Sequence, residues 1–399
     1  MSEASRIPPF LRLLQAEALL CTLAVMSFVA LVGPLSRDLG LAPWQAGTAV
    51  TVGGLAWLAL ARAWGAASDR LGRRRVVLMG LGGFVLSYGA LCLFMATALH
   101  LRLPAWLAFA GLVLLRGAAG GFYAAVPVCA AALVADHLEA RQRAAAMAAL
   151  GAASGVGMVA GPGLVGLLAG GGLLLPLAVT AALPAVALAL LWRGLPREAA
   201  RAPAHSAPPH LFDPRLRGPQ AMAFVAMFSV TVAQIVVSFF ALDRLGLDAA
   251  GAARAAGLAL TSVGVALIAA QLLVRRLAWP PARLIRVGGL LSAAGFALSM
   301  AAHESLWLCI GYFVAAAGMG WVFPAVSALA ANAVQPHEQG AAAGSVSAAH
   351  GLGMIVGPLA GTLVYPLDSA APFGLVAVLL AMAALWVSAR VPGGEHDRG

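Results

Sequence analysis

The sequence predicts an all-α membrane protein with twelve transmembrane helices in two pseudo-symmetric six-helix bundles. Three observations support this: twelve long apolar stretches, a composition that is 62% hydrophobic and 10% charged, and a similarity between the two halves. A helix needs about 20 apolar residues to cross ~30 Å of hydrocarbon. Spanning segments of this length are helices because every backbone polar group in lipid must be paired within the segment.

The predicted spans follow one another with short connections. They cover residues 13–35, 45–66, 76–99, 104–135, 143–169, 172–192, 219–242, 251–274, 284–301, 305–334, 338–364 and 370–389. The stretch 193–218 is rich in Pro, Arg and His and has no apolar period, which is typical of a linker. We therefore expect an N-terminal bundle at 1–192, a cytoplasmic linker at 193–218 and a C-terminal bundle at 219–399.

The basic residues predict the orientation. All 25 are arginines, and with the N-terminus in the cytoplasm nineteen lie on the cytoplasmic side and four on the outer side. This asymmetry follows the positive-inside rule and places both termini in the cytoplasm. It also accounts for the net charge of +10 without nucleic acid as a partner. The expected surroundings are a lipid bilayer, and the compact loops favour a bacterial inner membrane.

The halves share landmarks at a nearly constant spacing. Gly157, Gly161 and Pro162 recur as Gly353, Gly357 and Pro358, with an offset of 196 residues. Gln142 and Gln339, and Pro127 and Pro324, are offset by 197. Parallel repeats of six helices are typical of transporters.

The most specific motif lies between the second and third spans, in residues 65–75. It contains Gly65, Asp69, Arg70, Gly72, Arg73 and Arg74. Glycines near both ends allow a tight turn, and a carboxylate at the membrane edge is costly unless it is paired. An alternative is that the arginines only fix the topology.

This motif resembles the helix 2–3 signature of the major facilitator superfamily, G-x-L-[AS]-D-[RK]-x-G-[RK]-[RK], with Ala67 in place of the usual Leu. The resemblance implies a transporter that works by alternating access. It also implies a cytoplasmic gate in which the partner of Asp69 is a helix N-terminus, together with a motif arginine and an acid. The matching positions here are Glu338–Gly340, Arg70 or Arg73, and Asp136. A helix N-terminus attracts a carboxylate by ~0.3–2 kcal/mol. This contact would stabilise the outward-facing state.

Arg116 lies about 12 residues, or ~18 Å, from the outer end of its span. A charge at that depth is costly unless it has a partner or lines an aqueous cavity. The resemblance ties the matching arginine to proton coupling, whereas the alternative is an arginine bonded to backbone carbonyls.

The pattern around Gly157, Gly161 and Pro162 resembles the family's antiporter motif, with Ala148 and Val165 replacing two glycines. It favours export, although its repetition at Gly353 weakens it as an indicator of direction.

Proton antiport needs a titratable group that faces the cavity. The acid that tetracycline and multidrug exporters carry in the first helix is replaced by Thr22. Two candidates remain. Glu17 is expected about four residues from the cytoplasmic end of its helix, with snorkelling to water as the alternative. His350 is expected near the midplane, where a cross-helix hydrogen bond is the alternative role.

By family analogy, spans one, four, seven and ten line the cavity. The cavity-lining candidates from these spans are Thr22, Tyr123, Gln234, Phe239, Tyr312 and Trp321. This mixed, mostly uncharged set favours an amphiphilic organic molecule over a sugar.

The leading interpretation is a monomeric, drug:proton antiporter-like exporter of a small amphiphilic compound, with the proton as coupling ion and no cofactor or metal. Proton-linked uptake of a small organic solute is the alternative. A non-transporting membrane sensor is a remote one, because the longest loop is too short for a soluble domain. Enzyme motifs such as HExxH, GxSxG or a phosphate loop with Lys do not occur, so no enzymatic activity is expected.

Overall fold

The computed structural model describes residues 9–196, 213–277, 279–335 and 338–390. These residues contain twelve helices that are long and apolar enough to cross a membrane, which confirms the predicted spans within a few residues. Contacts divide the chain into two compact units, Met1–His205 with Asp248–Gly257, and Ser206–Leu247 with Leu258–Gly399. The predicted linker 193–218 falls mostly on residues outside the described ranges. Of its described part, residues 193–194 end one helix and residues 214–218 begin the next.

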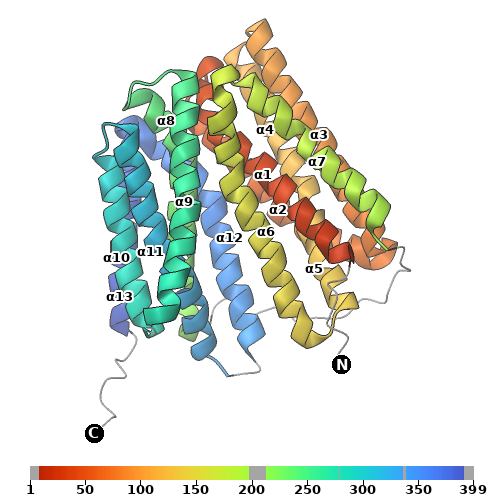
Figure 1. The fold of residues 1–399 in the computed structure, drawn as a ribbon, viewed down its shortest axis with the longest axis vertical. Helices are drawn as coiled ribbons and strands as arrows, with labels where there is room; N and C mark the ends of the chain where they lie inside the picture. Colours follow the sequence, from red (N-terminus) through yellow and green to blue (C-terminus); the bar gives the residue numbers. More distant parts are fainter. Residues whose placement is uncertain (1–8, 197–212, 278, 336–337, 391–399) are drawn as a thin grey trace. The chain divides into compact units, whose positions relative to one another are not determined.

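The helices are labelled in Figure 1. The first half of the chain forms α1 (Pro9–Asp38), α2 (Pro43–Leu71), α3 (Arg73–Leu101), α4 (Ala105–Tyr123), α5 (Ala125–His137), α6 (Ala140–Leu168), η1 (Ala169–Gly171) and α7 (Leu174–Gly194). The second half forms η2 (Pro214–Leu216), α8 (Arg217–Asp243), α9 (Ala249–Leu277), α10 (Pro281–Met300), α11 (Ser305–Asn332), α12 (Gln339–Val364), η4 (Tyr365–Leu367) and α13 (Ala371–Arg390).

Two breaks between helices have local causes. Gly72 separates α2 from α3 with a φ of 90°, a conformation that side chains with a Cβ rarely adopt. Ala124 separates α4 from α5 within a single membrane span. Pro127 explains this second break, because it has no N–H for the carbonyl of Tyr123 and its ring crowds that carbonyl.

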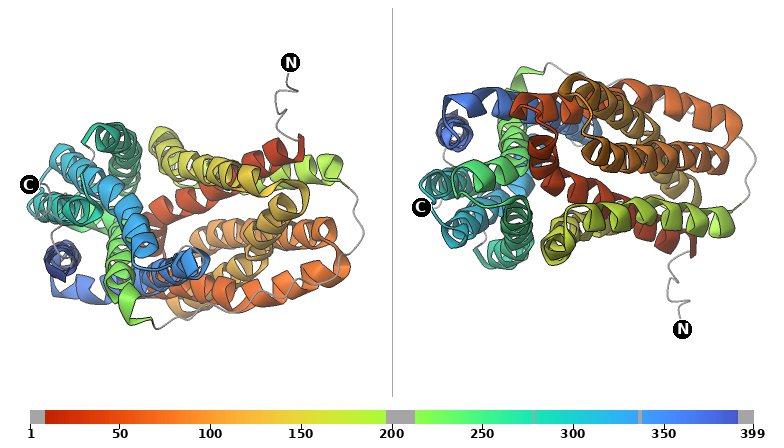
Figure 2. Two further views of the ribbon diagram at one scale, coloured as in Figure 1. Left: turned by 90° about the horizontal axis from the view of Figure 1, so that it is seen from below. Right: turned by 90° about the horizontal axis from the view of Figure 1, so that it is seen from above.

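Within each unit, the helices pair in the same order. In the first unit α1 packs on α6 and α7, and α3 packs on α4 and α7. In the second unit α8 packs on α12 and α13, and α10 packs on α11 and α13. The end views in Figure 2 show these helices running side by side as bundles. The matching pairs make the two halves copies of one packing plan.

The repeated Gly-Pro motifs lie at one of these matching contacts. A Cβ on Gly157 of α6 would come 2.5 Å from the carbonyl oxygen of Leu19 in α1, and a Cβ on Gly161 would come 2.5 Å from that of Leu23. In the second unit, a Cβ on Gly353 would come 2.5 Å from the carbonyl oxygen of Phe224 in α8.

The next turn repeats the contact, because a Cβ on Gly357 would come 2.9 Å from the oxygen of Phe228. Pro162 and Pro358 follow inside α6 and α12. Small residues at such positions let helix backbones approach closely.

Candidate functional site

The motif in residues 65–75 forms a charged cluster at one end of the first unit. Arg73, at the start of α3, forms an ion pair with Asp69 one turn earlier in the chain. Its Nε donates to Oδ2 of Asp136, at the end of α5, at 3.2 Å, and its NH1 donates to Oγ of Ser68 at 2.6 Å. These side chains are 18–29% exposed, so the cluster is partly shielded from water. Arg73, rather than Arg70, is therefore the arginine that joins the two carboxylates.

The structure corrects one detail of this motif. The predicted loop with a glycine near each end is reduced to Gly72, since Gly65 lies inside α2. A Cβ on Gly65 would meet only Val128 at 3.5 Å, which is an ordinary contact, so no turn or close approach requires glycine there. Its carbonyl instead accepts a hydrogen bond from Oγ of Ser68 at 2.7 Å.

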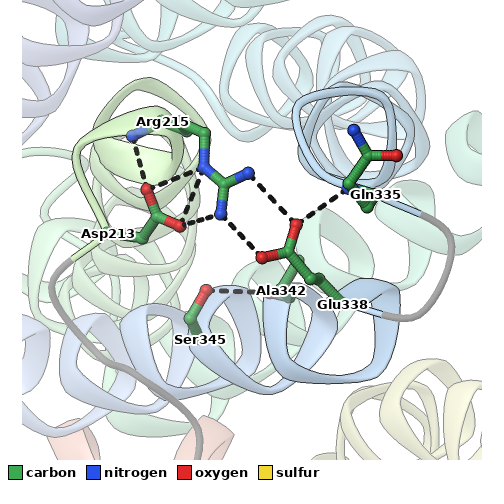
Figure 3. A network of polar contacts seen from close by, with 6 residues as sticks. All are labelled: Asp213, Arg215, Gln335, Glu338, Ala342 and Ser345. Carbon is green, nitrogen blue, oxygen red and sulfur yellow. Dashed lines mark hydrogen bonds and ion pairs between the residues drawn. The ribbon is translucent and has the colours of Figure 1, made fainter.

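Glu338 has its own partner within the second unit (Figure 3). Its carboxylate accepts hydrogen bonds from NH2 of Arg215 at 2.9 Å and from NH1 at 3.1 Å. It also accepts one from the backbone N–H of Gln335 at 2.9 Å. Asp213 holds the other edge of the same guanidinium, with NH2 of Arg215 at 2.7 Å from its Oδ2. Glu338 is the residue just before α12, so this network fixes the start of α12 to the start of α8.

The sequence did not identify Arg215 or Asp213 as partners. The gate contact between Asp69 and the N-terminus of α12 would join the two units, and it stays a prediction.

Glu17 lies deeper than the sequence predicts. Helix α1 begins at Pro9, so Glu17 is eight residues, or about 12 Å, along it. Its side chain is 3% exposed, and Oε1 has no hydrogen-bond donor among the described residues. The snorkelling alternative is therefore wrong. The predicted distance from the helix end was too short because the apolar pattern begins at residue 13, after the helix has already started.

Two of the cavity-lining candidates, Tyr123 and Thr22, lie near this carboxylate. Tyr123, at the end of α4, and Cys21, one turn further along α1, interact with Glu17 through their side chains. Thr22 in turn interacts with the hydroxyl of Tyr123. The structure thus brings Glu17, Thr22 and Tyr123 into one cluster. The break after Tyr123 leaves its carbonyl without the usual helical donor, which makes this point of α4 locally polar.

Arg116 lies in the middle of the α4–α5 span, next to a close helix contact. A Cβ on Gly120 would come 2.1 Å from the carbonyl oxygen of Gly53 in α2, so the two backbones nearly touch. The guanidinium lies on the same surface, because a Cβ on Gly53 would come 3.4 Å from NH1 of Arg116.

Its Nε is buried and has no acceptor among the described residues. Tyr88 of α3 is close enough to act on Arg116 electrostatically, and its own hydroxyl donates to the carbonyl oxygen of Ala24 at 2.6 Å. Sequence reasoning missed Gly53 and Tyr88, which carry no motif.

His350 lies in α12 of the second unit, eleven residues after the helix begins at Gln339. Its ring packs edge-on against Phe323 of α11 at a centroid distance of 5.5 Å. The buried Nε2 has no hydrogen-bond partner in the part of the chain that the structure describes. The alternative role, a cross-helix hydrogen bond, therefore finds no support at Nε2.

The remaining cavity candidates lie on α8 and α11. Tyr312 donates to the carbonyl oxygen of Ala233 at 2.7 Å, and Nε1 of Trp321 donates to that of Ala270 at 3.0 Å. Phe239 is fully buried, with its ring 5.9 Å from that of Tyr365. Gln234 is half-buried on α8. Tyr312 and Trp321 thus use their polar hydrogens to join neighbouring helices, and a cavity-lining role for the four stays a prediction.

No group of three or more His, Cys, Asp or Glu side chains that could hold a metal ion occurs within the described ranges. The first unit offers one buried carboxylate beside a tyrosine and one arginine at membrane depth, and the second unit offers one imidazole whose Nε2 has no partner among the described residues. These groups can take up, release and stabilise protons and can hold a polar part of a solute. They contain no nucleophile–base arrangement for covalent chemistry.

The chain is similar to several known transport and resistance proteins. One relative is the class D tetracycline resistance protein of Salmonella ordonez, which is 36% identical over 100 residues. The match covers 25% of this chain and 22% of that protein.

Among solved structures, the human organic anion transporter MFSD10 (TETRAN) is 21% identical, with a TM-score of 0.65 over 96% of this chain and all of that one. An inward-facing, occupied bacterial homologue of the human lysosomal transporter Spinster is 14% identical. It has a TM-score of 0.74 over 97% of this chain and 98% of that one.

The family model of the Major Facilitator Superfamily matches residues 18–253 and 221–399. Together with the twelve spans, the fold and the repeated packing, this match shows that the chain is a multi-pass, non-enzymatic membrane transporter that belongs to the major facilitator superfamily.

Proposed function

We propose that this transporter exports a small amphiphilic organic compound in exchange for protons. The observation that carries the proposal is the buried carboxylate of Glu17, which lies about 12 Å along α1 beside Tyr123, and whose Oε1 has no donor among the residues that the structure describes. An ionised carboxylate in such a place costs free energy, and a proton bound there removes the charge and with it this cost. Similarity to a tetracycline resistance protein supports export and an amphiphilic substrate.

In this proposal, a proton and the substrate favour different states of the transporter. A ligand shifts a conformational equilibrium only by its differential affinity for the two states. Protonation of Glu17 would remove the buried charge in one state, and deprotonation would require water or a donor in the other. Arg116 would contribute a fixed positive charge in the same unit, seven residues or about 10 Å along α4 from Tyr123, where it can hold an anionic or polar part of the solute.

The cytoplasmic gate completes the proposed cycle. The pairing of Asp69, Arg73 and Asp136 holds the ends of α2, α3 and α5 together within the first unit. The network of Asp213, Arg215 and Glu338 does the same for the starts of α8 and α12. We propose that each cluster keeps its own helix ends rigid while the units alternate. We place the protein in a bacterial inner membrane with both termini in the cytoplasm.

The proposal is tested in proteoliposomes with an imposed pH gradient and a panel of amphiphilic compounds that includes tetracycline. We expect Glu17→Gln to abolish pH-driven accumulation but to retain exchange of labelled for unlabelled substrate, because exchange needs no net proton movement. Glu304→Gln, an exposed carboxylate just before α11, is the matched control and should behave as wild type. Undiminished pH-driven transport by Glu17→Gln would refute the role of this carboxylate.

A second candidate is proton-linked uptake of a small organic solute, because one observation removes the argument for export from the Gly-Pro motif. The Gly-Pro motif that is typical of exporters makes the same contacts in both units, at Gly157 and at Gly353. A feature shared by both halves is explained by helix packing and gives no direction. Accumulation in energised right-side-out vesicles, rather than in inverted ones, would favour uptake over export.

A further inference from the structure

A pocket of about 480 Å³ opens at the end of the first unit where α2 ends, α3 begins and α7 ends. It is separate from the cluster around Glu17, and its walls include Gly72, Arg74, Arg75, Leu78, Met79 and Trp192. No carboxylate lines it in the part of the chain that the structure describes. The pocket therefore carries two positive charges and no acidic side chain in its walls.

One donor of the Arg74 guanidinium is hydrogen-bonded and another is unsatisfied within the described ranges. Its NH2 donates to the carbonyl oxygen of Trp192 at 2.7 Å, which ties α3 to the end of α7. Its Nε is buried and has no hydrogen-bond partner among the residues described. Gly72, the residue before α3, offers no side chain to cap the first N–H groups of that helix. A buried unsatisfied donor beside an uncapped helix N-terminus suits an anion with several acceptor oxygens.

The apolar wall of the pocket points to the source of that anion. Met79 lies six residues, or about 9 Å, along α3 from Arg73 and is 48% exposed. Trp192, another large apolar residue in the wall, is 64% exposed near the end of α7. Tryptophan is enriched where hydrocarbon meets headgroups. A soluble anion gains nothing from exposed methionine and indole, whereas acyl chains cover such a surface.

We infer that this pocket binds the headgroup of an anionic phospholipid, with the phosphate held by Arg74 and Arg75 and the acyl chains against Leu78, Met79 and Trp192. Basic pockets between transmembrane helices are a recurring form of lipid recognition. The site does not depend on the substrate, the coupling ion or the direction of transport.

The test is native mass spectrometry of the full-length protein in detergent, titrated with phosphatidylglycerol or with phosphatidylcholine of the same acyl chains. We expect wild type to retain phosphatidylglycerol preferentially. At about 1 kcal/mol per arginine, Arg75→Gln should lower the affinity for phosphatidylglycerol about 5-fold and Arg74→Gln with Arg75→Gln about 25-fold. Binding of phosphatidylcholine should change little.

The matched control is Arg283→Gln with Arg286→Gln, which removes two exposed charges at the start of α10 and should leave the affinity at wild-type level. Arg75→Gln tests the site without disturbing the bond between Arg74 and Trp192. Equal retention of phosphatidylglycerol by the double variant and wild type would overturn the inference. So would equal binding of phosphatidylcholine, or displacement of the lipid by millimolar inorganic phosphate, which would indicate a site for a soluble anion.

Discussion

The glycines of the repeated motif give a prediction whose magnitude follows from the packing. In Gly157→Ala, the new Cβ would lie 2.5 Å from the carbonyl oxygen of Leu19, closer than such atoms approach in proteins. Helices α6 and α1 would have to separate by at least about half an ångström along this contact. Overpacking of this kind costs about 1–3 kcal/mol. Alanine recovers about 1 kcal/mol through its better helix propensity.

The chain offers a control two residues away. A Cβ on Gly155 of the same helix would meet no atom within 4 Å, so Gly155→Ala should gain the helix propensity without the clash. The free energies of unfolding of the two variants should then differ by about 1–3 kcal/mol. The second unit repeats the pair, because a Cβ on Gly353 would come 2.5 Å from the carbonyl oxygen of Phe224, whereas a Cβ on Gly351 would meet no atom within 4 Å.

The assay is thermal unfolding of the purified protein in one detergent, with all four alanine variants compared with wild type. We expect Gly157→Ala and Gly353→Ala to unfold at lower temperature than Gly155→Ala and Gly351→Ala. If Gly157→Ala were as stable as Gly155→Ala, close helix packing would not be the reason for glycine at this position. If only one half of the chain followed the order, the two halves would not share one packing plan.

Further predictions concern the charged groups. Arg116→Ala should reduce pH-driven transport to background while the protein still folds, and transport at wild-type rate would remove Arg116 from the mechanism. Asp69→Asn should slow turnover with little change in substrate affinity, because one of the two carboxylates on Arg73 is lost; a loss confined to binding would contradict this. Arg215→Gln should change the unfolding temperature little, because the Arg215 side chain is 48% exposed, yet it should slow turnover, because the start of α12 is no longer held to the start of α8. An unchanged rate would show that the network has no role in transport.

The sequence predicts the class and the spans well because the bilayer imposes a strong one-dimensional rule. Each span must be apolar over its whole length, so hydropathy alone places the twelve spans within a few residues, although not the break between α4 and α5. The turn at Gly72 also follows from a local motif, whereas the family resemblance pointed to Asp69, Asp136 and either Arg70 or Arg73, of which Arg73 joins the two carboxylates. The predicted role of Gly65 in the turn was wrong, because residue type alone does not distinguish a glycine in a turn from one inside a helix.

The partners between helices were decided only by the tertiary structure. The pairing of Arg215 with Glu338, the burial of Glu17 beside Tyr123 and the contact of Gly53 with Arg116 each join segments far apart in the chain. They depend on how each helix is rotated about its own axis. In a soluble protein the apolar stripe indicates that rotation, but in lipid both the buried and the outward faces of a helix are apolar. Sequence therefore determined which segments cross the membrane, and packing determined which of their side chains meet.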